Sequence, residues 1–218
     1  PEWKLELLEQ GLGESWRILR CGMKAYPTEA LTHAPISCVL DLIREHELNP
    51  EQIEQVSIRS LERAADILAD PSKYDPRSKE TADHSLPYVI AAAIVDRQVT
   101  PKQFTQERIL DPVIRDQLHK VKVEADPEIE ALFPELQRVK VSIRTCDGAV
   151  HQKQVDYPKG DPRNPLSDRE VEEKFISLAD PVLHDRQAQR VIDQVWSLDR
   201  LESIRDLMML LNAHEEVV

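Results

Sequence analysis

"LPYVIAAAIVD", residues 86–96, is the stretch around which the rest of the chain must fold. Every residue from Tyr88 to Val95 is apolar, so a helix here has no polar side to turn toward water. A helix that is apolar all round is buried on every side. Pro87 stands near the front of the stretch, where it would start or kink the helix. We therefore predict a central helix that other elements cover.

Alternating apolar and polar residues predict strands on both sides of this helix in the sequence. Valine and isoleucine recur at every second position in the clearest of them, which turns one face toward a core. Asp147-Gly148 is a strong hairpin signal and joins the last two strands. The predicted strands are "EQVSIRS" at 54–60, "HKVKVEA" at 119–125, "RVKVSIRT" at 138–145 and "AVHQKQVDY" at 149–157, with "SWRILR" at 15–20 as an edge or entry strand.

Residues 35–46 have the spacing of an amphipathic helix, with Pro35 in its first turn. Its apolar positions are Ile36, Val39, Leu40 and Ile43. The helix should end before Asn49, because a residue that precedes proline is disfavoured in the α region. We expect shorter helices at 61–69, 100–104 and 111–118, and a proline-broken loop at 70–80.

The last third of the chain predicts three helices, the first opened by a capping box of Ser167 and Glu170. The residues expected to face inward are Val171, Phe175 and Leu178 in the first, Ala188, Val191, Ile192 and Val195 in the second, and Leu207, Met208 and Leu211 in the third. Strands and helices thus follow one another in irregular order. This indicates an α+β fold with a small, mostly antiparallel sheet covered by helices, rather than a doubly wound parallel sheet.

The composition excludes several classes of function. The 218 residues have a formal net charge of −12, so neither nucleic acid nor an anionic membrane is an expected partner. No apolar run approaches the ~18 residues of a membrane span, and no secretory signal pattern is present. The chain starts with Pro1 rather than Met, which we take to indicate processing or a longer polypeptide.

Cysteine and glycine usage gives no sign of a metal or nucleotide site. Cys21, Cys38 and Cys146 are odd in number and far apart, which fits a reducing cytoplasm and shows no local zinc or iron–sulfur pattern. The five glycines form neither a dinucleotide fingerprint nor a P-loop. We therefore expect no metal and no cofactor.

"KAYPTEALTH", residues 24–33, gathers polar side chains at the start of the amphipathic helix. Lys24 can bind a carboxylate or phosphate, Glu29 can act as a base, and His33 can transfer a proton near neutral pH. A structural explanation is equally available. Thr28 or Thr32 would then cap the helix, Glu29 would favour its first turn, and Lys24 would be a solvated charge.

"DHSLPY", residues 83–88, places polar residues before the central helix in the same way. In a helix, His84 and Tyr88 share a face, and the Tyr88 hydroxyl could reach a substrate. The commoner alternative is a tyrosine that packs its ring and bonds a backbone carbonyl. Ser85 does not predict a catalytic triad, because no G-x-S-x-G turn surrounds it. A third stretch, "YPKGDPRNPLS" at 157–167, is either an anion clamp of Lys159, Gly160 and Arg163 or a surface loop.

Taken in order, "KAYPTE…H", "ADHSLPYVIAAAIVD", "DPVIRDQLHKVKVEAD" and "VDYPKGDPRNPLSDREVEEKF" resemble the MmgE/PrpD family. The resemblance runs from about Trp16 to Leu211. It implies that residues 1–218 are the C-terminal α/β, lid-like domain of a two-domain enzyme. The family's N-terminal helical domain has no counterpart here, so we expect a missing helical domain or complementary chain as a partner.

The resemblance also implies a function. It suggests a metal-independent hydro-lyase for small di- or tricarboxylates, similar to 2-methylcitrate dehydratase of propionate catabolism and inactive without the helical domain. It gives Lys24 and Ser85 substrate contacts and makes Tyr88, His84, Glu29 and His33 catalytic. Glu29 favours a dehydratase, since decarboxylase-type members place a histidine there. The alternatives are cis-aconitate decarboxylase or iminodisuccinate epimerase activity, or a non-catalytic module for partner binding; a homo-oligomer is expected.

Overall fold

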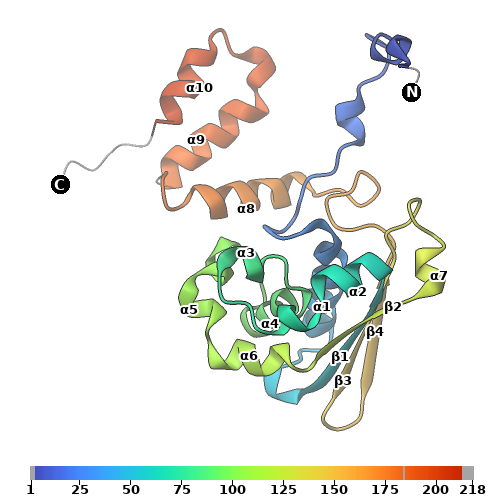
Figure 1. Ribbon diagram of the computed structural model, residues 1–218. Coiled ribbons are helices and arrows are strands. Elements are labelled where there is room, and N and C mark those ends of the chain that lie inside the picture. The colour runs from blue at the N-terminus through green and yellow to red at the C-terminus, as the bar shows by residue number, and fades with distance from the viewer. Residues whose placement is uncertain (1–2, 184, 213–218) are drawn as a thin grey trace. The chain divides into compact units, whose positions relative to one another are not determined.

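The computed structural model describes residues 3–183 and 185–212 of the chain. It divides into two compact units, Pro1–Pro165 and Leu166–Val218. The first unit contains the sheet and the predicted central helix, and the second contains helices (Figure 1).

The sheet has four strands in the order β2-β1-β3-β4. The pair β1–β2 is parallel, whereas β1–β3 and β3–β4 are antiparallel. The bounds are Ile53–Ser60 for β1, Val121–Ala125 for β2, Val139–Thr145 for β3 and Val150–Val155 for β4. Helices surround a small and mostly antiparallel sheet, so the predicted α+β class is confirmed.

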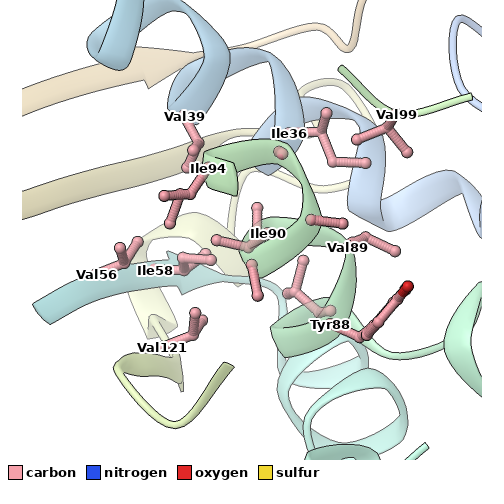
Figure 2. Packing of buried hydrophobic residues seen from close by; sticks show 14 of the residues in the cluster. Ile36, Val39, Val56, Ile58, Tyr88, Val89, Ile90, Ile94, Val99 and Val121 are labelled. Atoms are coloured by element: carbon pink, nitrogen blue, oxygen red, sulfur yellow. The ribbon is translucent and has the colours of Figure 1, made fainter. Parts of the chain in front are cut away.

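The central helix is α4, Leu86–Asp96, and every residue from Leu86 to Ile94 is buried. It packs beside α1, His33–Glu45, which itself lies over β3 and β4. Figure 2 shows Ile90 and Ile94 of α4 in one layer with Val56 of β1. The prediction of a buried central helix is confirmed, although Val95 at its end is only half-buried.

Only one face of the sheet carries these helices. Val56 and Ile58 of β1 are buried beneath them, and their partners in register, Ile143 and Val141 of β3, are buried too. The intervening Ser57 and Arg59 lie on the other, polar face. Strand alternation in the sequence therefore separates the core from the solvated side of the sheet.

Short helices connect the main elements of the first unit. They are η1 (Leu5–Leu8), η2 (Arg17–Arg20), η3 (Ala30–Thr32), η4 (Pro50–Gln52), α2 (Glu62–Leu68), η5 (Pro71–Tyr74), α3 (Lys79–Ala82), η6 (Pro101–Phe104), α5 (Gln106–Ile109), α6 (Pro112–Leu118) and α7 (Pro127–Glu130). The prediction of a strand at 15–20 is wrong: this segment forms η2, and its Ile18 and Leu19 side chains are exposed. The expected loop at 70–80 contains η5 and the start of α3, and α5 was not predicted.

The second unit consists of α8 (Asp168–Ala179), α9 (Asp185–Trp196), η7 (Leu198–Arg200) and α10 (Ile204–Leu210). The Ser167–Glu170 capping box is present. The buried cluster is small and consists of Leu183, Ala188, Val191, Leu207 and Leu210. Four residues predicted to face inward are instead exposed, because this cluster is too small to cover them: Leu178, Val195, Met208 and Leu211.

Two further properties concern the described residues 3–183 and 185–212. None of their helices is both long and apolar enough to cross a membrane. Many large apolar side chains before residue 24 are exposed, Trp3, Leu8, Leu12 and Trp16 among them.

The packing around α4 predicts a strong dependence of stability on its side chains. Ile90→Ala should lower the free energy of unfolding by about 2–5 kcal/mol, because the Ile90 side chain is fully buried. Ile67→Ala is the matched control, since Ile67 is 55% exposed, and should change stability by about 0.5 kcal/mol or less. Urea unfolding followed by circular dichroism measures both, and equal losses would contradict a central α4.

Candidate functional site

The two polar stretches singled out in the sequence meet in the structure. The backbone N–H of Glu29 donates a hydrogen bond of 3.1 Å to the carbonyl oxygen of Asp83. Glu29 precedes α1 and Asp83 precedes α4, so the starts of these two packed helices lie side by side. Helix N-termini carry partial positive charge, which favours an anionic ligand. We call Lys24, Glu29, Asp83 and His84 the polar cluster.

In the first stretch, one end of the cluster is held by main-chain contacts. The Lys24 ammonium donates to the carbonyl oxygen of Thr28 at 2.8 Å. The Glu29 carboxylate accepts from the Leu31 N–H at 2.6 Å and so caps η3. Thr32 stands at the N-cap position of α1, as one alternative predicted, but its side chain makes no cap hydrogen bond there. Lys24 is exposed and Glu29 half-buried, so both can be reached from solvent.

His33, the first residue of α1, lies deeper than these groups and is 3% exposed. Its ring meets the Tyr26 ring edge-on, with 5.4 Å between the centroids. The Tyr26 hydroxyl lies 3.1 Å from the Ser37 hydroxyl. His33 therefore packs under the first stretch, and Tyr26 was not among the predicted site residues.

The second stretch contributes a carboxylate–imidazole pair. The His84 Nδ1 lies 2.5 Å from one Asp83 carboxylate oxygen, and the Lys79 ammonium lies 3.5 Å from the other. The His84 side chain is 54% exposed, whereas that of Asp83 is 14% exposed. A carboxylate in this position holds the histidine ring in one orientation through its Nδ1 atom. Asp83 was missed as a site residue, although its place beside His84 in the sequence was the available signal.

Ser85 and Tyr88 are buried, and their hydroxyl groups make hydrogen bonds that stabilise the fold. Ser85 is fully buried; its hydroxyl donates to the Lys73 carbonyl oxygen at 2.6 Å and accepts from the Tyr88 N–H, which caps α4. Tyr88 has no exposed surface, and its hydroxyl donates to the Gln103 carbonyl oxygen at 2.5 Å. Burial raises the pKa of Tyr88 above its ordinary value. The structure does not bring either side chain to the surface beside Lys24.

The third stretch lies against the first. The Met23 N–H donates to the Gly160 carbonyl oxygen at 2.8 Å, directly before Lys24. Arg163 is engaged within the loop: its guanidinium binds both carboxylate oxygens of Asp161 and lies 4.0 Å from the centre of the Tyr157 ring. This geometry favours the reading of 157–167 as a structured loop over an anion clamp.

A search of the described residues for a metal site finds no group of three or more His, Cys, Asp or Glu side chains that could hold an ion. The polar cluster instead combines one amine, two carboxylates and one imidazole. Such a set can bind an organic anion and move a proton near neutral pH.

Comparison with known proteins identifies the family. The family model of the MmgE/PrpD C-terminal domain matches residues 26–198. The chain belongs to the MmgE/PrpD family. This confirms the resemblance drawn from the sequence, and the matched range contains Glu29, His33 and the whole "DHSLPY" stretch.

Curated relatives in this family are similar along most of the chain. Cis-aconitate decarboxylase of Aspergillus terreus strain NIH 2624 is 26% identical over 97% of the chain. Cis-aconitate decarboxylase of Mus musculus is 28% identical over 86%, and that of Homo sapiens is 33% identical over 62%. The chain spans only 44%, 38% and 28% of the lengths of these three relatives.

The contacts of Tyr88 predict a structural effect of removing its hydroxyl. Tyr88→Phe leaves the buried Gln103 carbonyl without this donor and should lower the free energy of unfolding by about 1–3 kcal/mol. Tyr74→Phe is the control, because the Tyr74 hydroxyl bonds the Val121 carbonyl from a half-buried position and should cost about 1 kcal/mol or less. Thermal unfolding measures both, and an unchanged Tyr88→Phe protein would show that the hydroxyl has another role.

Proposed function

We propose that this chain supplies the lid-side wall of the active site of a lyase that acts on a small tricarboxylate. The observation that carries the proposal is the backbone Glu29–Asp83 hydrogen bond, which brings the stretch that carries the exposed Lys24 amine to the Asp83–His84 pair, whose imidazole is exposed and whose carboxylate is largely covered. Family membership supports it, since curated relatives are named for cis-aconitate decarboxylation.

The first candidate reaction is decarboxylation of a cis-aconitate-like substrate. One carbon–carbon bond to a carboxylate breaks, carbon dioxide leaves, and the electron pair left on carbon takes up a proton. In this proposal the Lys24 ammonium binds a carboxylate that remains on the substrate, and protonated His84 delivers the proton, with Asp83 holding its ring. His33 has a supporting role beneath the cluster.

The second candidate is dehydration of a 2-methylcitrate-like substrate, and Glu29 favours it. A base removes the proton from a carbon beside a carboxylate, an acid protonates the β-hydroxyl, and water leaves. Glu29 is the base in this alternative, at the position where the family resemblance places a histidine in decarboxylases. Epimerisation of an iminodisuccinate-like substrate shares the proton abstraction and is distinguished by an unchanged mass. In each case we assign neither Ser85 nor Tyr88 a contact with substrate.

The proposal includes a partner, either a helical domain or a complementary chain. Exposed apolar side chains in the first unit, such as Trp3 and Leu8, and in the second unit, such as Trp196 and Met209, support it. We propose that the part of the curated relatives outside the match covers these side chains and supplies the remaining acid and base groups. Homo-oligomerisation and a purely non-catalytic binding role are the alternatives.

The exposed thiols Cys21 and Cys146 suit a reducing, cytoplasmic location, which we include in the proposal.

Binding of a tricarboxylate should depend on the Lys24 charge. Lys24→Gln should weaken binding of cis-aconitate about tenfold or more, since hydrogen bonds to charged groups contribute about 1.5–3 kcal/mol. Lys102→Gln is the control, because Lys102 is an exposed lysine of η6 outside the cluster. Titration calorimetry with cis-aconitate and with 2-methylcitrate compares the variants, and equal affinities would remove Lys24 from the site.

The chain alone should not turn over substrate, because a single wall provides only part of an acid–base site. Incubation with cis-aconitate or 2-methylcitrate followed by mass spectrometry separates loss of carbon dioxide, loss of water and no change. Turnover equal to that of the intact Aspergillus terreus relative under the same conditions would refute the need for a partner.

A further inference from the structure

Directly before Lys24 in the sequence, the backbone makes a close contact with the loop that carries Gly160. Residues 22–25 cross Gly160, and the Met23 N–H donates to the Gly160 carbonyl oxygen at 2.8 Å. Gly160 has φ of +94°, a conformation that favours glycine. A Cβ atom added there would overlap the carbonyl oxygen of Met23, so the main chains can meet only because residue 160 lacks a side chain.

Gly22 contributes to the same contact from the other segment. A Cβ atom added to Gly22 would lie 3.0 Å from the Gly160 carbonyl oxygen. Two of the chain's five glycines therefore meet here. The lack of a side chain at Gly160 is what allows the hydrogen bond between Met23 and Gly160 to form, and glycine at residue 22 avoids a tight contact beside it.

The loop that carries Gly160 is held from several sides. The Gly160 N–H donates to the Asn164 carbonyl oxygen at 2.8 Å, and the Asn164 side chain donates to the Tyr157 carbonyl oxygen at 2.9 Å. Arg163 binds Asp161 through two hydrogen bonds and also donates to the Glu135 carbonyl oxygen at 2.9 Å. Hydrogen bonding from Arg163 lowers the pKa of Asp161, which keeps this pair charged at neutral pH. Gly160 thus presents a fixed surface to residues 22–25.

Residues 4–21, by contrast, form backbone hydrogen bonds with close neighbours in the sequence. Their short helices η1 and η2 have no buried residues. The Met23–Gly160 contact therefore joins this exposed segment to the folded body directly before Lys24. Lys24 is fixed on its other side by the bond to Thr28.

We infer that Gly160 is a positioning residue, which docks the main chain at Met23 and so sets the place of the Lys24 ammonium in the polar cluster. The docking itself does not depend on any function, whereas its purpose rests on the proposed binding of a tricarboxylate by Lys24. The role differs from the anion clamp considered for this loop, because Gly160 acts through its backbone and does not need to touch substrate.

The test compares Gly160→Ala with Gly148→Ala, a matched glycine control. Gly148 has φ of +89° at the hairpin turn, but a Cβ atom there meets nothing within 4 Å. Both variants strain a left-handed residue, and only Gly160→Ala forces the Met23 segment away. Limited trypsin digestion followed by mass spectrometry should show cleavage after Lys24 at least tenfold faster in Gly160→Ala and unchanged in Gly148→Ala. Cleavage after Arg17 and Arg20, which lie in exposed η2, provides the internal reference.

Titration with cis-aconitate is the second arm. Gly160→Ala should lose about as much affinity as Lys24→Gln, and Gly148→Ala should lose none. Faster cleavage with full affinity would overturn the positioning role, and unchanged cleavage after Lys24 would overturn the docking. If the unaltered protein binds neither tricarboxylate, the proposed function fails, while faster cleavage would still support the docking. Gly22→Ala crowds the same contact less severely and should give an intermediate rate of cleavage after Lys24. It replaces Gly160→Ala in the test if that variant does not fold.

Discussion

Burial of α4 is the constraint on which the rest of the first unit depends. Since α4 has no polar side, α1 and the sheet must cover it, and α1 packs alongside it. The starts of the two helices then meet, and the Glu29 N–H reaches the Asp83 carbonyl. The polar cluster is therefore a consequence of core packing: residues far apart in the sequence converge because the helices that follow them must share one apolar interior.

Most of the first unit could be predicted because its local patterns agree with its packing. Strand β3 alternates cleanly, β1 does so after an irregularity between Ile53 and Gln55, and the residues at their apolar positions are buried. In the second unit the same reasoning predicted the helices but misjudged Val195 and Met208. Periodicity reports which side of a helix is apolar, but it cannot tell whether this chain covers that side. The strand prediction for residues 15–20 was wrong for a related reason: in the part of the chain that the structure describes, the sheet consists of β2, β1, β3 and β4, and residues 15–20 pair with none of them.

The candidate site could be located from the sequence as two stretches but not resolved into roles. His84 and Tyr88 are four residues apart, yet His84 is exposed before α4 begins and Tyr88 is inside the core. The spacing rule requires both residues to lie in one helix, and the Ser85 cap places the start of α4 between them. Gly160 was harder to assign, because its contact with Met23 joins segments that sequence reasoning treats separately.

Glu29 shows how structural and chemical roles can share one residue. Its carboxylate accepts the Leu31 N–H at the start of η3, and its own N–H bonds Asp83. A proton taken up by this carboxylate would weaken the cap, because a neutral acid is a poorer acceptor. Catalysis through Glu29 would thus disturb the turn that links the two stretches. His84 has no such conflict, since its ring is exposed beside Asp83 and the cap of α4 is made by Ser85, and this favours His84 over Glu29 for the proposed proton transfer.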